Sequence, residues 1–188
     1  MELFDDEIFE NIDFSKQVVS GLEYDNCTFK KCNFSNCNLS GKSFLDCRFE
    51  ECNLSMLNLS NVCLRNVIFE ECKLIGNDFS KCNDMFFSAR FTRCQLDYTF
   101  FYKKKLKKTN FVDCSIKEAN FSEADIAGSV FQNCDLSRTI FFHTNLNHVD
   151  FRTAANFSID PESNQIKKAK FSRSGIIGLL DKYEIEIE

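Results

Sequence analysis

Cysteine and histidine are the residue types in this chain that could act as metal ligands or catalytic groups. The 188 residues include 11 cysteines, with a regular C-x4-C spacing, and two histidines, His143 and His148. No serine–histidine–aspartate set, glycine-rich phosphate loop or H-E-x-x-H motif accompanies them. Zinc binding would need cysteines that converge on one tetrahedral point. Whether they converge depends on the elements that carry them.

A five-residue repeat runs through the chain and determines where these side chains point. From Asn26 the chain reads, in blocks of five, NCTFK KCNFS NCNLS GKSFL DCRFE ECNLS MLNLS, with phenylalanine or leucine in the fourth position. Eighteen of the 22 phenylalanines occupy this central position, among them Phe86 and, beyond the main run, Phe171. A period of five fits neither the 3.6 residues of a helix nor the two residues of an ordinary strand. The chain is therefore predicted to be built from stacked repeats.

The pattern A/C-N/D-F/L-x-x resembles that of the pentapeptide-repeat family. The resemblance implies an all-β fold, a right-handed quadrilateral β-helix with four repeats in each coil. Residues 20 positions apart should then stack, and one two-residue insertion near residues 81–87 keeps the central phenylalanines in one column. The members of that predicted column are Phe9, Phe29, Phe49, Phe69, Phe91, Phe111, Phe131 and Phe151.

Cysteine is the commonest residue at the position two before each centre, which also points inward. These cysteines are Cys27, Cys32, Cys37, Cys47, Cys52, Cys72, Cys82, Cys94, Cys114 and Cys134. Successive repeats face different sides, and cysteines stacked along one side lie about 4.8 Å apart without converging. We therefore interpret them as small buried apolar residues and predict no metal site and no cofactor. Cys63 lies outside this register and is the predicted exposed thiol.

Two lysines interrupt the inward pattern. Lys42 and Lys104 occupy positions where the other repeats have small residues. A buried, unpaired ammonium group is costly. We interpret each lysine as part of a bulged corner from which the ammonium group reaches solvent. A functional role is the alternative.

The repeat is predicted to cover residues 1–157, and residues 158–188 form a C-terminal segment that caps the rod or joins two rods. Pro161 interrupts the ladder of hydrogen bonds. Ser174 could cap a short helix over residues 175–183, and the alternation after Tyr183 resembles a strand. The candidate dimer-interface residues are Ile176, Ile177, Leu179, Leu180, Tyr183, Ile185 and Ile187.

Charge divides the chain into acidic ends and a basic waist. Residues 1–60 hold 11 acidic and 5 basic residues, and residues 61–110 hold 5 acidic and 10 basic ones. The waist, Lys103, Lys104, Lys105, Lys107 and Lys108, is either a solvated patch or a contact site for an acidic partner. Candidate partner-binding residues beyond the waist are Asp113, Glu118, Glu123, Asp125, Asp135 and Asp150. They are either a solubilising surface or one that carries carboxylates as a DNA duplex carries phosphates.

The segments IDPESNQI and GIIGLLDKYEIEI resemble the endings of the microcin B17 immunity protein and its relatives, the Qnr quinolone-resistance group. This resemblance implies an elongated homodimer joined through its C-terminus, with a DNA-like surface. The implied partner is DNA gyrase or topoisomerase IV, which the protein would protect from a toxin or a quinolone. The alternative is an interaction scaffold with an unassigned protein partner. It would bind through the waist or through the excursion at Asn83, Asp84 and Met85.

The remaining expectations concern function class and location. No catalytic constellation is present, so we predict that the protein is not an enzyme. The net charge of −5 gives no reason to expect direct binding to nucleic acid. The acidic N-terminus lacks the features of a signal peptide, and no apolar run reaches the roughly 18 residues of a membrane helix. A cytoplasmic protein with no membrane association is therefore predicted.

Overall fold

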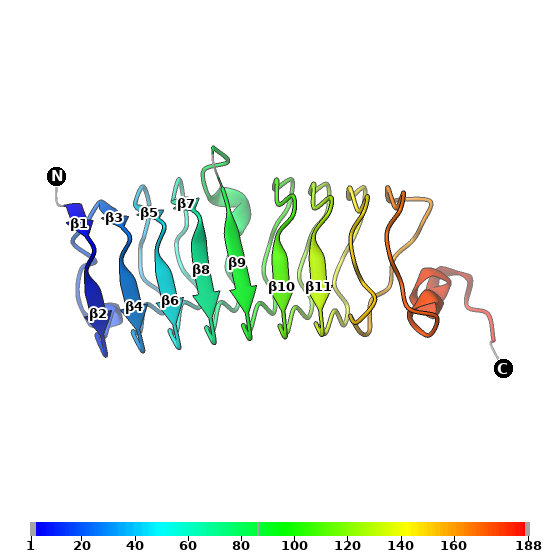
Figure 1. The fold of residues 1–188 in the computed structure, drawn as a ribbon, viewed down its shortest axis with the longest axis horizontal. Coiled ribbons are helices and arrows are strands. Elements are labelled where there is room, and N and C mark those ends of the chain that lie inside the picture. The colour runs from blue at the N-terminus through cyan, green and yellow to red at the C-terminus, as the bar shows by residue number, and fades with distance from the viewer. Residues whose placement is uncertain (1–2, 86, 187–188) are drawn as a thin grey trace.

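A computed structural model describes residues 3–85 and 87–186 as a parallel β-solenoid whose coils stack into a rod (Figure 1). The N-terminus lies at one end of the rod and the C-terminus at the other (Figure 1). The prediction of a β-solenoid with 20 residues per coil is confirmed, because Phe9 pairs with Phe29 and Phe29 with Phe49. Its right-handed sense stays a prediction, and Phe86 lies outside the described residues.

Two sheets of parallel strands form two sides of the rod. One sheet contains β1 (Leu3–Asp5), β3 (Glu23–Asp25), β5 (Ser43–Leu45) and β7 (Cys63–Arg65). The other contains β2 (Ile8–Glu10), β4 (Thr28–Lys30), β6 (Arg48–Glu50), β8 (Val67–Glu70), β9 (Ala89–Thr92), β10 (Asn110–Val112) and β11 (Val130–Gln132). Elsewhere the coils are joined by single bridges, and two short 3-10 helices, η1 (Phe14–Lys16) and η2 (Phe79–Lys81), lie within the coils.

Most corners have one residue with a left-handed backbone, two positions after the repeat centre. Asn11, Asn36 and Gly41 have φ values of 56°, 59° and 72°. Asparagine and glycine tolerate this conformation better than other residues do. The asparagine before a centre adds a second turn contact, since Asn53 Oδ1 accepts a hydrogen bond of 3.2 Å from the backbone N–H of Ser55. The sequence pattern N-F/L-S therefore encodes a corner as well as a core.

The register changes once, in the middle of the rod. Strand partners are 20 residues apart up to β8, but Phe69 pairs with Phe91 and Lys73 bridges to Gln95, 22 residues away. The spacing returns to 20 from β9 onward. The extra residues fall between Asn83, whose N–H bonds the Val62 carbonyl, and Ser88, whose N–H bonds the Leu64 carbonyl. An excursion of the chain, residues 83–85 and 87–88, thus leaves the coil at this point.

A column of stacked phenylalanine rings forms the core. Ring centroids lie 4.7 Å apart for Phe29 and Phe49, 5.2 Å for Phe91 and Phe111, and 4.8 Å for Phe111 and Phe131. The column continues to Phe171, 5.5 Å from Phe151, and bridges continue to Lys170. The coil therefore extends past residue 157, where the sequence predicts the repeat to end. Pro161 does not stop it, because the side chain of Asn164 donates to the Phe141 carbonyl and accepts from the N–H of Thr144.

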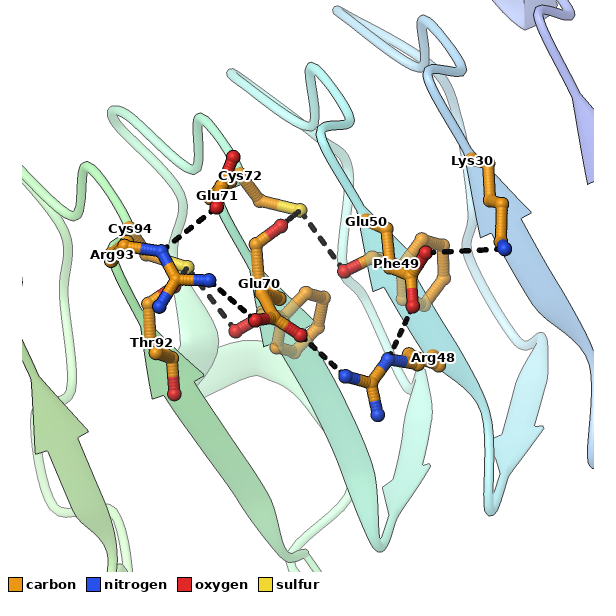
Figure 2. Close-up of polar contacts among 11 residues, drawn as sticks. Lys30, Arg48, Phe49, Glu50, Glu70, Glu71, Cys72, Thr92, Arg93 and Cys94 are labelled. Atoms are coloured by element: carbon orange, nitrogen blue, oxygen red, sulfur yellow. Dashed lines mark hydrogen bonds and ion pairs between the residues drawn. The ribbon is translucent and has the colours of Figure 1, made fainter.

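The predicted burial of ten cysteines is confirmed, and Cys63 alone is half-buried. Each thiol of the main column bonds backbone carbonyls, as Cys72 does with those of Phe49 and Glu70 at 3.4 and 3.3 Å (Figure 2). Burial raises the pKa of Cys47 and of Cys82 to about 12. Cysteine suits this position because it is small and apolar yet still a weak donor.

The prediction that Lys42 and Lys104 reach solvent was wrong. The two side chains are 7% and 1% exposed. The ammonium group of Lys42 donates to the Gly21 carbonyl at 2.5 Å, and that of Lys104 donates to the Cys82 carbonyl at 2.7 Å. Carbonyl oxygens inside the coil give each ammonium group a partner, so it need not reach the surface.

The C-terminal segment differs from the predicted helix and strand. Two 3-10 helices form, η3 (Gly175–Leu179) and η4 (Asp181–Tyr183), and Ser172 rather than Ser174 accepts the N–H of Gly175. The predicted strand is absent from the described residues, since Tyr183 lies in η4 and residues 184–186 are irregular. Close packing of η3 against Phe157 requires glycine at position 178, because a Cβ there would lie 2.2 Å from the Phe157 carbonyl oxygen. No helix among the described residues has the length and hydrophobicity of a membrane span.

Candidate protein-binding surface

The six predicted carboxylates do not form one surface. Asp125, Asp135 and Asp150 lie in three different bridge ladders of the rod. Glu118 and Glu123 lie at corners, each with a left-handed backbone, as does Asp113. Carboxylates that face different sides cannot together present a single acidic stripe.

Ion pairs also neutralise five of these six carboxylates. The pairs are Glu118–Arg138 at 2.8 Å, Glu123–Lys103 at 3.4 Å, Asp125–Lys107 at 3.0 Å, Asp135–Lys117 at 3.1 Å and Asp150–Arg152 at 2.7 Å. Asp113 instead accepts a hydrogen bond of 2.9 Å from the side chain of Asn133. The bond from Arg152 holds the pKa of Asp150 below its ordinary value, and the hydroxyl of Tyr102 does the same for Glu123.

Three of the five lysines of the basic waist are paired in the same way. Lys103 contacts Glu123 and Lys107 contacts Asp125, in each case one coil further along the rod. Lys104 contacts Asp84 at 2.7 Å. No ion pair within the described residues reaches Lys105 or Lys108. The sequence signal for these ion pairs is a pair of opposite charges about 20 residues apart, because such residues stack in neighbouring coils.

A ladder of charged side chains crosses β4, β6, β8 and β9 (Figure 2). Arg48 contacts Glu50 at 2.5 Å and also Glu70, and Arg93 contacts Glu70 at 2.5 Å and Glu71 at 2.8 Å. The bonds from Arg48 and Arg93 keep the pKa of Glu70 below its ordinary value. Because these pairs are partly exposed, each contributes little stability, about 0–1 kcal/mol. The ladder is a neutral surface rather than an anionic one.

Unpaired acidic groups remain at the N-terminal end of the rod. Asp5 of β1 and Asp25 of β3 lie directly side by side in register, and Glu23 lies beside Leu3. Glu7 and Glu10 follow in the first coil and are exposed. Among the described residues, no ion pair reaches any of these five carboxylates. The sequence indicates an acidic N-terminal end, since residues 1–60 carry the largest excess of acid, but the candidate binding residues named from the sequence did not include this acidic N-terminal edge.

Comparison with known proteins defines the family. A family model described as the pentapeptide repeat region matches residues 22–101, 84–152 and 105–179. The chain belongs to the pentapeptide-repeat family. A search of curated proteins finds no match.

Solved structures of another protein share the fold. Full-length QnrB1, a plasmid-mediated fluoroquinolone resistance protein, has a TM-score of 0.57 and 20% sequence identity, with 98% of this chain and 100% of that chain covered. A trypsin-treated variant of QnrB1 has a TM-score of 0.56 and 21% identity, with 99% and 98% covered. At these identities, the likeness establishes the fold of the rod.

The excursion from the pentapeptide-repeat coil brings its three candidate residues together. The side chain of Asn83 accepts a hydrogen bond of 2.8 Å from the N–H of Met85, and Met85 is exposed. The side chain of Asp84 is 63% exposed while it contacts the buried Lys104. The excursion is therefore anchored from inside the coil and displays polar groups outside it.

The candidate dimer residues lie at the C-terminal end of the rod. Ile176, Ile177, Tyr183 and Ile185 are about half exposed, whereas Leu179 packs against the core. Ile187 lies outside the described residues. The end of the pentapeptide-repeat rod thus displays apolar side chains that a second rod could cover.

Proposed function

We propose that this pentapeptide-repeat protein is a non-enzymatic mimic of DNA that binds a bacterial type II topoisomerase. By occupying the DNA-binding surface of gyrase or topoisomerase IV, it would protect the enzyme from a toxin or a quinolone in the cytoplasm. The observation that carries this proposal is the likeness to QnrB1, a fluoroquinolone resistance protein, over the full length of both chains.

The acidic N-terminal edge supports the mimicry. Carboxylates in register on adjacent coils lie about 4.8 Å apart, the spacing of neighbouring strands. Phosphates of one DNA strand recur about every 3.4 Å along the helix axis, a comparable interval. Because Asp5, Glu23 and Asp25 are free of ion pairs within the described residues, their charge is available to a basic surface.

Protection of gyrase tests the proposal. Wild-type protein at micromolar concentration is expected to restore DNA supercoiling by gyrase in the presence of a fluoroquinolone. The variant Asp5→Asn/Glu23→Gln/Asp25→Asn is expected to need about tenfold more protein, a loss of about 1.4 kcal/mol. Absence of both protection and binding by the wild type would eliminate the proposal.

A matched control removes three charges that already have partners. In Asp125→Asn/Asp135→Asn/Asp150→Asn each new asparagine is the residue that other repeats use before their centres, as at Asn33 and Asn53. This variant should fold and protect like the wild type. If it alone loses protection, Asp125, Asp135 or Asp150 contributes to binding and the N-terminal edge does not.

We also propose that two rods join through the apolar C-terminal end. Light scattering is expected to give twice the mass of one chain for the wild type and a single mass for Ile177→Asp. The control Val18→Asp changes another exposed apolar residue near the N-terminal end, 88% exposed, and should stay dimeric. A wild-type protein with the mass of one chain would overturn the dimer.

A further inference from the structure

Four large apolar side chains lie exposed on one side of the rod. Phe100, Tyr102, Ile140 and Phe142, here called the aromatic face, are 46%, 40%, 50% and 51% exposed. They flank the buried centres Phe101 and Phe141. The core therefore does not need them, because the repeat places the centres inside and these neighbours outside.

Other repeats on the same side show what the fold itself requires at these positions. Where the aromatic face has Phe100 or Ile140, the equivalent positions include Asn38, Asn58 and Asn120. Each asparagine accepts the N–H of a serine two residues later, as Asn120 does from Ser122 at 2.8 Å. Phenylalanine and isoleucine cannot make this bond, and they expose apolar surface to water. The aromatic face therefore costs stability and is not explained by folding.

The aromatic face has a regular geometry. Phe100 bridges to Asn120 and Asn120 to Ile140, so two apolar rows lie two coils apart with a row of Asn120 and Ser122 between them. At about 4.8 Å per coil, the two rows are roughly 9.6 Å apart along the rod. The middle coil also places Glu118 and Glu123 at its two corners.

Contacts hold these side chains in place before any partner arrives. The hydroxyl of Tyr102 donates to Glu123 at 2.9 Å, and the ammonium group of Lys103 lies 4.9 Å from the centre of the Tyr102 ring. The ring of Phe142 lies 4.0 Å from that of His143. Binding to side chains that are already ordered loses less conformational entropy.

The area of the aromatic face indicates a small occupant. Four half-exposed side chains of about 200 Å² each offer on the order of 400 Å². A stable protein dimer needs about 800 Å² from each partner. The aromatic face alone is therefore too small to join two rods and suits one short segment of another protein.

The spacing of the two rows identifies the conformation of that segment. In an α-helix, residues i and i+7 lie on one side about 10.5 Å apart, close to the separation of the rows. In an extended strand, residues on one side recur about every 6.8 Å, so successive side chains fall at about 6.8 and 13.6 Å and miss the second row. A helix lying along the rod would also place residues i+3 and i+4 over the middle coil, between Glu118 and Glu123.

We propose that the aromatic face binds one amphipathic helix of a partner protein, which lies along the rod with apolar side chains seven residues apart on the two rows. The helix has small residues above Asn120 and Ser122 and polar residues toward Glu118 and Glu123, whose charges are already paired within the rod. This site is separate from the acidic N-terminal edge and from the C-terminal end.

A designed peptide tests the geometry directly. The probe is a fluorescein-labelled, alanine-rich helical peptide of about 18 residues, with leucines at i and i+7 and flanking lysines. Fluorescence anisotropy is expected to show binding to the wild-type protein at least about fivefold tighter than binding of a peptide of the same composition with leucines at i and i+5. Equal binding of the two peptides would overturn the helical register.

Variants of the protein locate the site. Phe100→Asn/Phe142→Ser installs the residues of neighbouring repeats, so the rod should keep its circular dichroism spectrum and its thermal midpoint, and peptide binding should fall at least about tenfold. The control Met56→Asn removes another exposed apolar side chain, 59% exposed, and should bind the peptide unchanged. Unchanged binding by the double variant would overturn the proposal. So would self-association of the wild type that the double variant abolishes, since the occupant would then be a second copy.

Discussion

Replacing Phe111 by alanine is expected to lower the free energy of unfolding by about 3–5 kcal/mol. The ring is completely buried, stacked on Phe91 at 5.2 Å and on Phe131 at 4.8 Å. Edge-to-face contacts join it to Phe101 and Phe121 at 6.3 and 6.1 Å. Truncation removes all four ring contacts and leaves a void that neighbouring coils cannot fill, because backbone ladders fix their spacing. Urea unfolding followed by circular dichroism measures the loss.

Phe142→Ala is the matched control for this prediction. Phe142 is the same residue type, one and a half coils further along the rod, but its side chain is half exposed. Its removal should change the free energy of unfolding by no more than about 0.5 kcal/mol. Similar losses for the two variants would contradict the assignment of the phenylalanine column as the core. A second unfolding transition that is seen for Phe111→Ala but not for Phe142→Ala would show that the two halves of the rod unfold independently.

The phenylalanine column was predictable because the signal for it is simple. Each centre is large and apolar, the period is constant, and a shift of two residues is enough to bring Phe69 and Phe91 into one column. The burial of the cysteines follows from the same period. Side chains whose position is fixed by the backbone alone can be placed from sequence.

The candidate site was harder to predict because its properties depend on pairs of residues in neighbouring coils. Glu123 is acidic in the sequence, but Lys103 lies next to it in the rod and neutralises it. Phe100 and Phe142 are ordinary phenylalanines in the sequence, and their shared surface appears only when the intervening coil is in place. The acidic N-terminal edge is likewise defined by the absence of basic residues beside Asp5 and Asp25 in the described part of the rod.

Lys104 lies inside the core, and its environment likewise depends on residues in a neighbouring coil. The second large effect on the free energy of unfolding is expected at this residue. Its side chain is 1% exposed, and its ammonium group contacts Asp84 at 2.7 Å, the Cys82 carbonyl at 2.7 Å and the face of the Phe87 ring at 4.5 Å. Removing one partner of a fully buried ion pair costs roughly 3–5 kcal/mol, because the remaining charge loses its counter-ion. Since Asp84 is largely exposed, we expect Asp84→Ala to lie at the lower end of this range, about 3 kcal/mol. Thermal and urea unfolding measure this change.

Lys104→Met should cost less than Asp84→Ala, although it removes the buried partner. Methionine fills a similar volume without a charge, Asp84 becomes solvated, and the main loss is the hydrogen bond to the Cys82 carbonyl, worth about 1 kcal/mol. In the Lys104→Met background, Asp84→Ala should then have almost no further effect, so the two changes couple by about 2–3 kcal/mol. The exposed pair Lys107–Asp125 is the control, and Lys107→Met should change stability by less than about 0.5 kcal/mol. Additive losses from Asp84→Ala and Lys104→Met would mean that the ammonium group is compensated by backbone carbonyls alone. The excursion would then have no electrostatic anchor in the core.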